Sequence, residues 1–281
     1  MADHHVRPED FEFISQFLRT RSGQVLEPGK EYLVRSRLAP LAERHHLADL
    51  HQLVQRLRTG VHARLEIEVV EAMAVTETSF FRDVHPFETL RLEVLPRLIA
   101  NRRPERRLAI WCAASSSGQE PYSVAMLLKE YFPELEGWSV DLTATDMSQE
   151  MLERSRAGRY SQIEANRGLS VAMREKWFQR HGKEWQIDER IRRMVTFRQL
   201  NLAQPWPITS RWDLILMRNV MIYFDVELKK QILSRVSRSL QPDGYLLLGG
   251  AETTLNLDDS FQRVEGWTSS VYRRTGFQPV T

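Results

Sequence analysis

Several features that would each assign this sequence to a class of protein are scarce or missing. It has one cysteine in 281 residues, which excludes an internal disulfide framework and is typical of a reducing compartment. No apolar run approaches the ~20 residues that a membrane-spanning helix needs. The polar start, residues 1–10, lacks the apolar core of a signal peptide. We therefore expect a cytoplasmic protein that does not insert into membranes.

An excess of one charge is also missing. The formal net charge is +2, so composition gives no general attraction to nucleic acid, and we expect no nucleic-acid partner. His45 and His46 point in different directions on an expected helix, without cysteine or aspartate at ligand spacing, so we expect no metal site. Hydrophobic residues make up 42% of the chain and charged residues 27%, as in globular proteins with a full core.

Residues 1–75 predict a helical domain, because every apolar segment has the 3.6-residue period. The expected inward-facing residues are Phe11, Ile14 and Phe17 in a first helix, Val34, Leu38 and Leu41 in a second, Leu50, Leu53, Val54 and Leu57 in a third, and Leu65, Val69 and Met73 in a fourth. Gly23 would end the first helix and Asp49 would cap the third. The pattern breaks over residues 74–86, and we assign residues 76–90 to a linker.

Helix and strand signals alternate after this break, and we assign residues 91–281 to a second domain. Expected strands are Leu108–Cys112, Ser139–Thr145, Val195–Arg198, Trp212–Met217 and Tyr245–Gly249, and expected helices are Phe87–Ile99, Pro121–Tyr131, Gln149–Arg156 and Val226–Leu240. Such alternation predicts an α/β domain with a mostly parallel sheet covered on both faces. A closing pair of strands near Phe261 and Val271, joined by a short turn, should be antiparallel.

The most informative segment is LAIWCAASSSGQEPYSVAM, residues 108–126. It predicts a buried strand, a loop of small residues that Gly118 closes, and a helix. Doubly wound sheets bind nucleotide-like cofactors at such a junction. Here Glu120 stands in the first helical turn, where a phosphate would otherwise bind. The site therefore favours a cofactor with an amine or a cation.

A second acidic residue, Asp146, ends the next expected strand, where a carboxylate can accept both ribose hydroxyl protons. The loop lacks G-x-G-x-x-G, and Asp146 lies farther on than the ~20 residues of the dinucleotide fingerprint, which argues against NAD. Two carboxylates at neighbouring strand ends suit S-adenosylmethionine, which carries a sulfonium and an ammonium. Taken singly, Asp146 could instead cap the following helix, and Glu120 could be an acid favoured by the helix dipole.

Five motifs in order resemble one family. They are TETSFFRD (76–83), WCAASSSGQEPYS (111–123), ATDMS (144–148), LILMRNVMIYF (214–224) and DGYLLLGGAE (243–252). Together they resemble the CheR-type chemotaxis receptor glutamate O-methyltransferases over nearly the whole chain. The resemblance implies a class I (Rossmann-like) methyltransferase sheet, an N-terminal all-α domain and a small inserted subdomain at about 158–194. It also implies methyl esterification of receptor glutamates, with S-adenosylmethionine converted to S-adenosylhomocysteine.

The resemblance further implies roles for individual residues. The cofactor contacts would be Thr76, Thr78, Arg82, Glu120, Asp146, Asn201, Leu202, Arg218 and Asn219. Glu120 would hold the amino group, Asp146 the ribose, and Asn201 and Leu202 the adenine. Thr76 stands where the family often has asparagine, and its hydroxyl can still form a hydrogen bond.

The implied reaction needs no general base, because a glutamate with a pKa near ~4.3 is already anionic at neutral pH. The enzyme must align the carboxylate with the methyl donor in a dry site. Arg82 and Tyr223 are our candidates for orienting the substrate, and hence for the catalytic residues. Alternatively, Arg82 could form a salt bridge with Asp83 or Glu77, and Tyr223 could pack in the core.

Lys30, Arg37 and Arg44 are spaced seven apart and form one stripe on the second expected helix. This stripe is either a solvated face or, as the resemblance implies, the docking surface for the acidic methylation region of a helical chemoreceptor. Some members of the family also grip a pentapeptide tether at the receptor C-terminus. Residues 177–197 are several residues short and lack a glycine-rich turn, so we expect recognition without the tether.

Two other functions compete with this interpretation. A methyltransferase for nucleic-acid amines often carries N-P-P-Y or D-P-P-Y after the fourth strand, whereas residues 219–223 here read NVMIY. A non-catalytic adaptor could bind the cofactor or a receptor without transferring a methyl group. Intact Arg82, Glu120 and Asp146 argue against the adaptor.

Overall fold

The computed structural model describes residues 6–208 and 211–276. The chain forms two compact units: a helical unit, Met1–Thr76 with Tyr223–Leu228, and a sheet unit, Glu77–Ile222 with Lys229–Thr281. Within the described ranges, no helix is both long and apolar enough to cross a bilayer.

Four helices build most of the helical unit: α1 (Pro8–Ser22), α2 (Glu31–Arg44), α3 (Leu50–Arg58) and α4 (Ala63–Met73). The apolar positions expected on α2, α3 and α4 are all buried, whereas α1 buries Ile14 and Leu18 completely and Phe17 only in part. Asp49 caps α3 by accepting the Gln52 N–H at 2.8 Å, and Gly23 ends α1 with φ +75°. The predicted helices and caps are therefore confirmed.

The sheet unit contains a seven-stranded sheet in the order β6-β2-β1-β7-β8-β10-β9. Its strands are β1 (Arg107–Ala113), β2 (Ser139–Asp146), β6 (Val195–Gln199), β7 (Trp212–Met217), β8 (Leu240–Leu248), β9 (Phe261–Arg263) and β10 (Val271–Arg274). Strands β6, β2, β1, β7 and β8 pair in parallel, and β10 is antiparallel to β8 and β9. The expected α/β sheet and its antiparallel closing pair are confirmed.

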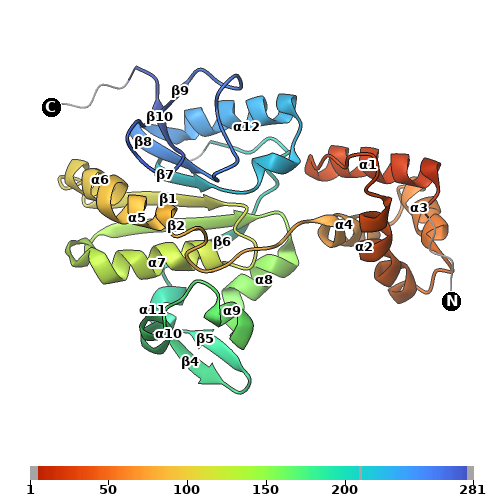
Figure 1. The fold of residues 1–281 in the computed structure, drawn as a ribbon, viewed down its shortest axis with the longest axis horizontal. Helices are drawn as coiled ribbons and strands as arrows, with labels where there is room; N and C mark the ends of the chain where they lie inside the picture. Colours follow the sequence, from red (N-terminus) through yellow and green to blue (C-terminus); the bar gives the residue numbers. More distant parts are fainter. Residues whose placement is uncertain (1–5, 209–210, 277–281) are drawn as a thin grey trace. The chain divides into compact units, whose positions relative to one another are not determined.

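The crossover helices determine where a ligand can bind. They include α7 (Gln119–Tyr131), α8 (Gln149–Ala157) and α12 (Val226–Ser239). Before β1 the chain forms α5 (His85–Thr89), the π-helix η1 (Leu90–Val94) and α6 (Leu95–Asn101). Two short 3₁₀ turns are η2 (Pro133–Leu135) and η3 (Met221–Tyr223). The steps β1–α7–β2 and β7–α12–β8 run in opposite directions along the sheet, so right-handed crossovers put α7 and α12 on opposite faces (Figure 1). The strand order therefore reverses between β1 and β7, which is the place where such sheets bind ligands.

An insertion after α8 forms a small antiparallel sheet in the order β3-β5-β4. Its elements are β3 (Arg159–Ser161), α9 (Gln162–Asn166), α10 (Val171–Trp177), β4 (Phe178–His181), β5 (Glu184–Ile187) and α11 (Glu189–Arg192). The Tyr160 ring lies 4.9 Å from that of Phe80, and its hydroxyl donates to the Ser117 carbonyl at 2.8 Å. Gly168 has φ +89°, and a Cβ there would lie 1.7 Å from the Phe80 carbonyl oxygen. The insertion thus supports both the loop after β1 and the segment around Phe80.

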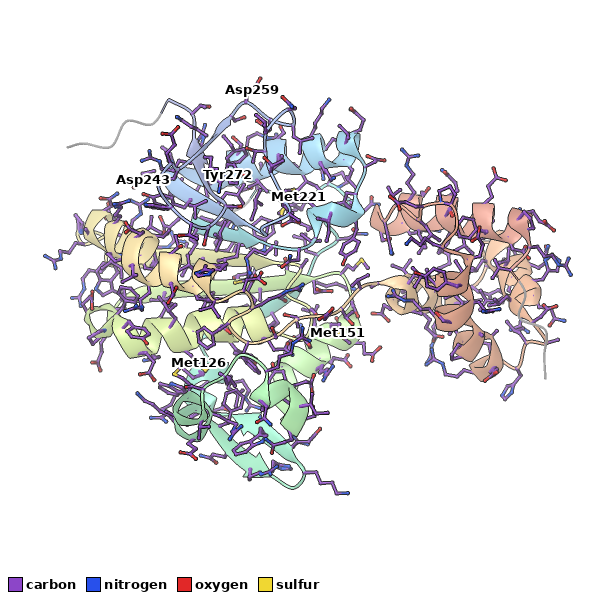
Figure 2. All side chains as sticks on the ribbon, in the orientation of Figure 1. Met126, Met151, Met221, Asp243, Asp259 and Tyr272 are labelled. Carbon is purple, nitrogen blue, oxygen red and sulfur yellow. The ribbon has the colours of Figure 1, made fainter. Side chains whose placement is uncertain are left out.

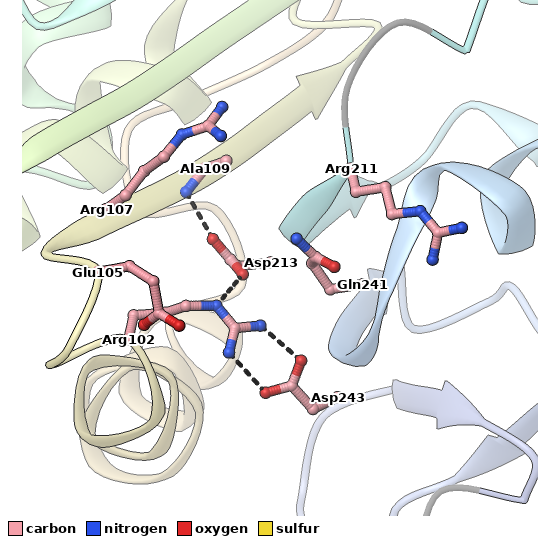
Figure 3. Close-up of a pocket in the computed structure, with 8 residues that line it drawn as sticks. All are labelled: Arg102, Glu105, Arg107, Ala109, Arg211, Asp213, Gln241 and Asp243. Atoms are coloured by element: carbon pink, nitrogen blue, oxygen red, sulfur yellow. Dashed lines mark hydrogen bonds and ion pairs between the residues drawn. The ribbon is translucent and has the colours of Figure 1, made fainter.

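An ionic cluster joins β1, β7 and β8 at the end of the sheet where these parallel strands begin. Arg102 donates from Nε to Asp213 at 2.6 Å and from Nη1 to Asp243 at 2.8 Å, while Asp213 accepts the Ala109 N–H at 2.7 Å (Figure 3). Figure 2 shows Asp243 and Met221 at opposite ends of this part of the sheet. Burial raises the pKa of Asp243, but hydrogen bonds and charge from Arg102 outweigh it, so this pKa lies below its ordinary value.

Candidate cofactor site

The loop between β1 and α7 makes a tight turn that small residues permit. Ala114, Ser116 and Gly118 have φ values of +53°, +49° and +90°. A Cβ on Gly118 would lie 2.9 Å from the Ser155 Oγ, so only glycine fits there without a shift. Ser155 in α8 donates to the Ser116 carbonyl at 2.9 Å, and Tyr160 holds the next carbonyl. The loop is therefore fixed from α8 and from the insertion.

Asp146 ends β2 beside this loop and accepts two backbone N–H groups. Its Oδ2 accepts from Ser116 at 2.7 Å, and its Oδ1 accepts from Ser148 at 2.9 Å. The residue that caps α8 is Ser148, whose hydroxyl accepts the Met151 N–H, so the alternative in which Asp146 itself caps that helix is wrong. A carboxylate oxygen can accept more than one hydrogen bond, so the ribose contact of Asp146 stays a prediction.

A buried ion pair spans the reversal point between β1 and β7. Arg218, directly after β7, donates from Nη1 to the Glu120 Oε2 at 2.7 Å. Its Nη2 donates to the Asp83 Oδ2 at 2.8 Å and to the Arg82 carbonyl at 3.0 Å. The Arg218 side chain is only 1% exposed and lies over the Phe87 ring at 5.6 Å. Arg218 therefore joins the strand end, the helix start and the linker segment.

The charges around Glu120 act in opposite directions on its protonation. Burial raises the pKa of Glu120 and so does the charge of Glu252, whereas Arg218 and Arg82 lower it, and the result is a raised pKa. Burial also raises the pKa of the neighbouring Cys112 thiol, which is a core residue here. Among the described residues, Glu120 receives its hydrogen bond on Oε2 alone. The Oε1 atom can therefore accept an ammonium group.

Asn201 and Leu202 follow β6, the strand next to β2. The Leu200 N–H donates to the Asp146 carbonyl at 2.9 Å, which brings this segment against the end of β2. Asn201 accepts the Ala203 N–H on its Oδ1 at 2.9 Å, and Leu202 is 5% exposed. The structure thus brings the predicted adenine and ribose residues to neighbouring strand ends.

Arg82 lies half-buried in the linker segment near Glu120. It donates from Nη1 to the Glu77 carbonyl at 2.9 Å. Asp83 pairs with Arg218, and the Glu77 carboxylate pairs with Arg167 at 2.6 Å. In the described ranges Arg82 forms no ion pair, so the alternative of a salt bridge to either acid is wrong.

The other predicted residues are distributed over both units. Thr78 is half-buried in the sheet unit. Thr76 and Tyr223 belong to the helical unit, where the Tyr223 carbonyl accepts the Val25 N–H at 2.8 Å. Their contacts with a cofactor or substrate stay predictions.

The predicted stripe of Lys30, Arg37 and Arg44 differs in accessibility from residue to residue, and Lys30 lies directly before α2 rather than in it. Arg44 is exposed, and Lys30 is half-buried with its Nζ 5.9 Å from the Tyr32 ring centre. Arg37 donates from Nη1 to the carbonyls of Met73 and Ala74, at 2.6 Å and 3.0 Å. These carbonyls end α4, so Arg37 holds two helices together.

Sequence reasoning missed two residues of the site. Asp83 shares Arg218 with Glu120, and Glu252 accepts backbone N–H groups from the segment after β7. Both lie in motifs that we quoted, at the linker and after a strand of the sheet. The position of Glu252 at a strand end was the available signal, because strand ends on one edge come together.

Two buried polar atoms at this edge fit a site that binds a polar ligand. The Ser115 Oγ and the Arg218 Nε have no hydrogen-bond partner in the described structure, although buried polar groups are nearly always paired. Together with the acids of Glu120 and Asp146, they suit the amino acid and ribose parts of S-adenosylmethionine. The fold and the site define a class I methyltransferase that uses S-adenosylmethionine.

Comparison with known proteins identifies the family. Residues 76–269 match the CheR methyltransferase, SAM binding domain, and residues 9–74 match the CheR methyltransferase, all-alpha domain. The chain is 41% identical over 271 residues to the chemotaxis protein methyltransferase of Vibrio parahaemolyticus, covering 95% of this chain and 98% of the relative. It is 41% identical over 268 residues to chemotaxis protein methyltransferase 1 of Pseudomonas aeruginosa, covering 94% and 97%. The chain belongs to the CheR methyltransferase family.

Proposed function

We propose that this protein transfers a methyl group from S-adenosylmethionine to glutamate side chains of chemoreceptors, forming glutamyl methyl esters in the cytoplasm during chemosensory signalling. The names of its relatives support a role in chemotaxis. The observation that carries the proposal is Arg82, a half-buried residue. Its carbonyl and the Glu120 carboxylate both accept hydrogen bonds from Arg218, and its own guanidinium donates to the Glu77 carbonyl at 2.9 Å. Arginine has five N–H donors in a fork that matches a carboxylate, so Arg82 can hold the incoming glutamate.

Each residue then has a limited task. Glu120 and Asp146 hold the two ends of the methyl donor, while the charge of Arg218 opposes the effect of burial on the pKa of Glu120. Arg82 aligns the substrate carboxylate, whose oxygen already carries the electron pair that forms the new bond. When bound, S-adenosylmethionine supplies an electrophilic methyl group and leaves as S-adenosylhomocysteine. No residue has to remove a proton, so a buried general base is not needed.

The substrate partner is proposed to be the cytoplasmic helical region of a receptor, docked on the helical unit near Lys30 and Arg44. The insertion has a short connection at Gly182 and Lys183 between β4 and β5, in agreement with the short segment noted in the sequence. We therefore propose recognition without a pentapeptide tether. Measurable binding of a tether pentapeptide in calorimetry would contradict this part of the proposal.

Methylation of a purified receptor fragment with labelled S-adenosylmethionine tests the function. We expect label on the receptor that mild alkali releases as methanol, and no label when the acceptor glutamates are replaced by glutamine. Alkali-stable label would identify a methylamine product and the rival methyltransferase class. Cofactor binding without any label would identify the adaptor.

A further inference from the structure

Glu252 is a buried carboxylate at the same edge of the sheet as the cofactor site. It follows β8 by four residues, is 6% exposed, and sits in a turn closed by its own N–H and the Gly249 carbonyl at 3.0 Å. Lysine and arginine make no ion pair with it in the described part of the chain. A buried acid without a cation needs hydrogen bonds to replace the water that it has lost.

Four backbone N–H groups supply those hydrogen bonds. The Glu252 Oε2 accepts from Asn219 at 2.8 Å and from Gly249 at 2.7 Å. The Oε1 accepts from Val220 at 2.9 Å and from Met221 at 2.7 Å. Three successive N–H groups directed at one anion form a nest, the type of backbone concavity that commonly binds ligand anions. Here a side chain of the protein itself fills it.

The surrounding backbone has the shape that this contact needs. Asn219 adopts a left-handed conformation with φ +59°, which is unusual for a residue other than glycine. A Cβ on Gly249 would lie 2.7 Å from the Glu252 Oε2 and 2.9 Å from the Asn219 Nδ2. The glycine is therefore required for the carboxylate to reach the segment after β7.

That segment starts with the two residues assigned to the cofactor after β7. Arg218 reaches Glu120 and Asp83, and Asn219 is the first residue that Glu252 holds. We propose that Glu252 is a positioning residue for the cofactor site, fixing the backbone of residues 219–221 so that Arg218 and Asn219 face the donor. This inference rests on the proposed cofactor roles of Arg218 and Asn219.

The chemistry explains why a carboxylate is needed. A glutamine at this position would keep one acceptor oxygen and turn its NH₂ group toward two N–H donors, so half of the contacts would become repulsive. An aspartate would keep the charge but lack the reach. Glu252 also affects the electrostatics of the site. Burial and the charge of Glu252 raise the pKa of Glu120, whereas Arg218 and Arg82 lower it.

Calorimetric binding of S-adenosylhomocysteine to the full chain, repeated at several pH values, tests the proposal. We expect Glu252→Gln to weaken binding by at least about tenfold and to move the acid midpoint of binding to lower pH. Glu265→Gln, which removes the same charge from an exposed turn, should leave both unchanged. If Glu252→Gln lowers only the melting temperature, and neither the affinity nor the midpoint of the folded protein changes, the role is structural and the proposal is wrong.

Two further variants keep the test decisive if Glu252→Gln folds poorly. Glu252→Asp should weaken binding while leaving the acid midpoint in place, because the charge is kept. Gly249→Ala should weaken binding with Glu252 intact, because its methyl group displaces the carboxylate. Wild-type affinity in both variants would overturn the proposal. A wild-type protein that binds S-adenosylhomocysteine but methylates no receptor would instead contradict the proposed function and leave this inference standing.

Discussion

At the scale of single residues, the site depends on acids whose partners were only partly visible in the sequence. The motif containing Glu120 predicted that this acid binds the ammonium group of a ligand. In the structure Glu120 already pairs with a cation of the protein, because Arg218 Nη1 donates to its Oε2 at 2.7 Å. Nothing in the local sequence around either residue shows this pairing, because they are 98 positions apart. It follows from the strand order, which places the ends of β1 and β7 side by side.

Glu120→Gln should weaken binding of S-adenosylhomocysteine by about 10- to 100-fold at neutral pH, because the ammonium loses a charged acceptor. In the wild type, the pKa of Glu120 is raised, so affinity should fall as the pH decreases through that raised value, above the ordinary range of a glutamate. Calorimetry from about pH 8 down to about pH 5 measures both effects. A wild-type affinity that stays flat over this range, or a variant with the same acid dependence, would show that Glu120 does not bind the ammonium.

Asp146→Ala should weaken cofactor binding by about 1.5–3 kcal/mol, the range for hydrogen bonds to a charged group. The variant loses the ribose contact and also frees the N–H groups of Ser116 and Ser148. A product analogue without the ribose hydroxyls separates these effects: it should bind the wild type more weakly than the normal product, and the variant equally. If the variant still prefers the hydroxylated form, Asp146 only supports the loop.

At the scale of secondary structure, periodicity and capping were reliable where a segment is regular. Strand Trp212–Met217 and the start of α12 at Val226 agree with the prediction. Most other elements differ by only one or two residues at an end, and two differ by more. The helix expected over 87–99 contains the π-helix η1. A single π-helical turn changes the spacing of apolar residues too little to be recognised in the sequence. Strand β8 begins at Leu240 rather than Tyr245, because Leu240 pairs with Trp212 before an irregularity in the register, after which pairing resumes between Leu214 and Tyr245.

The insertion was the least predictable element from residues alone. Its strands are three or four residues long, too short for a clear alternation, and only the family resemblance suggested a β subdomain. Its contacts with the site are also invisible in sequence, since Tyr160 and Ser117 are 43 positions apart. Long-range packing, rather than local propensity, determines these features.

Asp243→Asn should destabilise the protein by roughly 1–3 kcal/mol at neutral pH, because Arg102 loses its charged partner across the strands. Asp243 has a lowered pKa in the folded protein, so its stabilising effect is complete above the unfolded value of about 3.9 and is lost as the pH falls through the lower folded value. Thermal unfolding of both proteins at decreasing pH measures this. The difference in melting temperature should shrink below about pH 4; a constant difference would mean that the ion pair is not its source.

At the scale of the whole molecule, the near-neutral net charge places any electrostatic recognition in local patches. The α2 stripe is such a patch, although Arg37 is partly used to hold the end of α4. Replacing Arg37 would therefore change the stability of the helical unit as well as receptor docking, and the two effects could not be separated. Lys30 and Arg44 are the members that can be changed with less effect on the helical unit.

Lys30→Gln with Arg44→Gln should slow receptor methylation at low salt and leave affinity for S-adenosylhomocysteine unchanged. The effect should disappear as salt rises, because screening removes the attraction in the wild type as well. Initial rates at two salt concentrations measure this, with Arg56→Gln and Arg263→Gln as a control that removes two exposed charges elsewhere. Equal slowing by both pairs would discard the docking stripe.

The guanidinium behind Glu120 has a consequence for turnover. In the proposed reaction, S-adenosylhomocysteine takes its ammonium group with it when it leaves, and a buried Glu120 without another counter-ion would be strongly destabilised. Arg218 lies 2.7 Å from Glu120 and belongs to the protein itself, so we expect it to balance that acid after the donor has left. We therefore expect Glu120 to keep its orientation between successive turnovers.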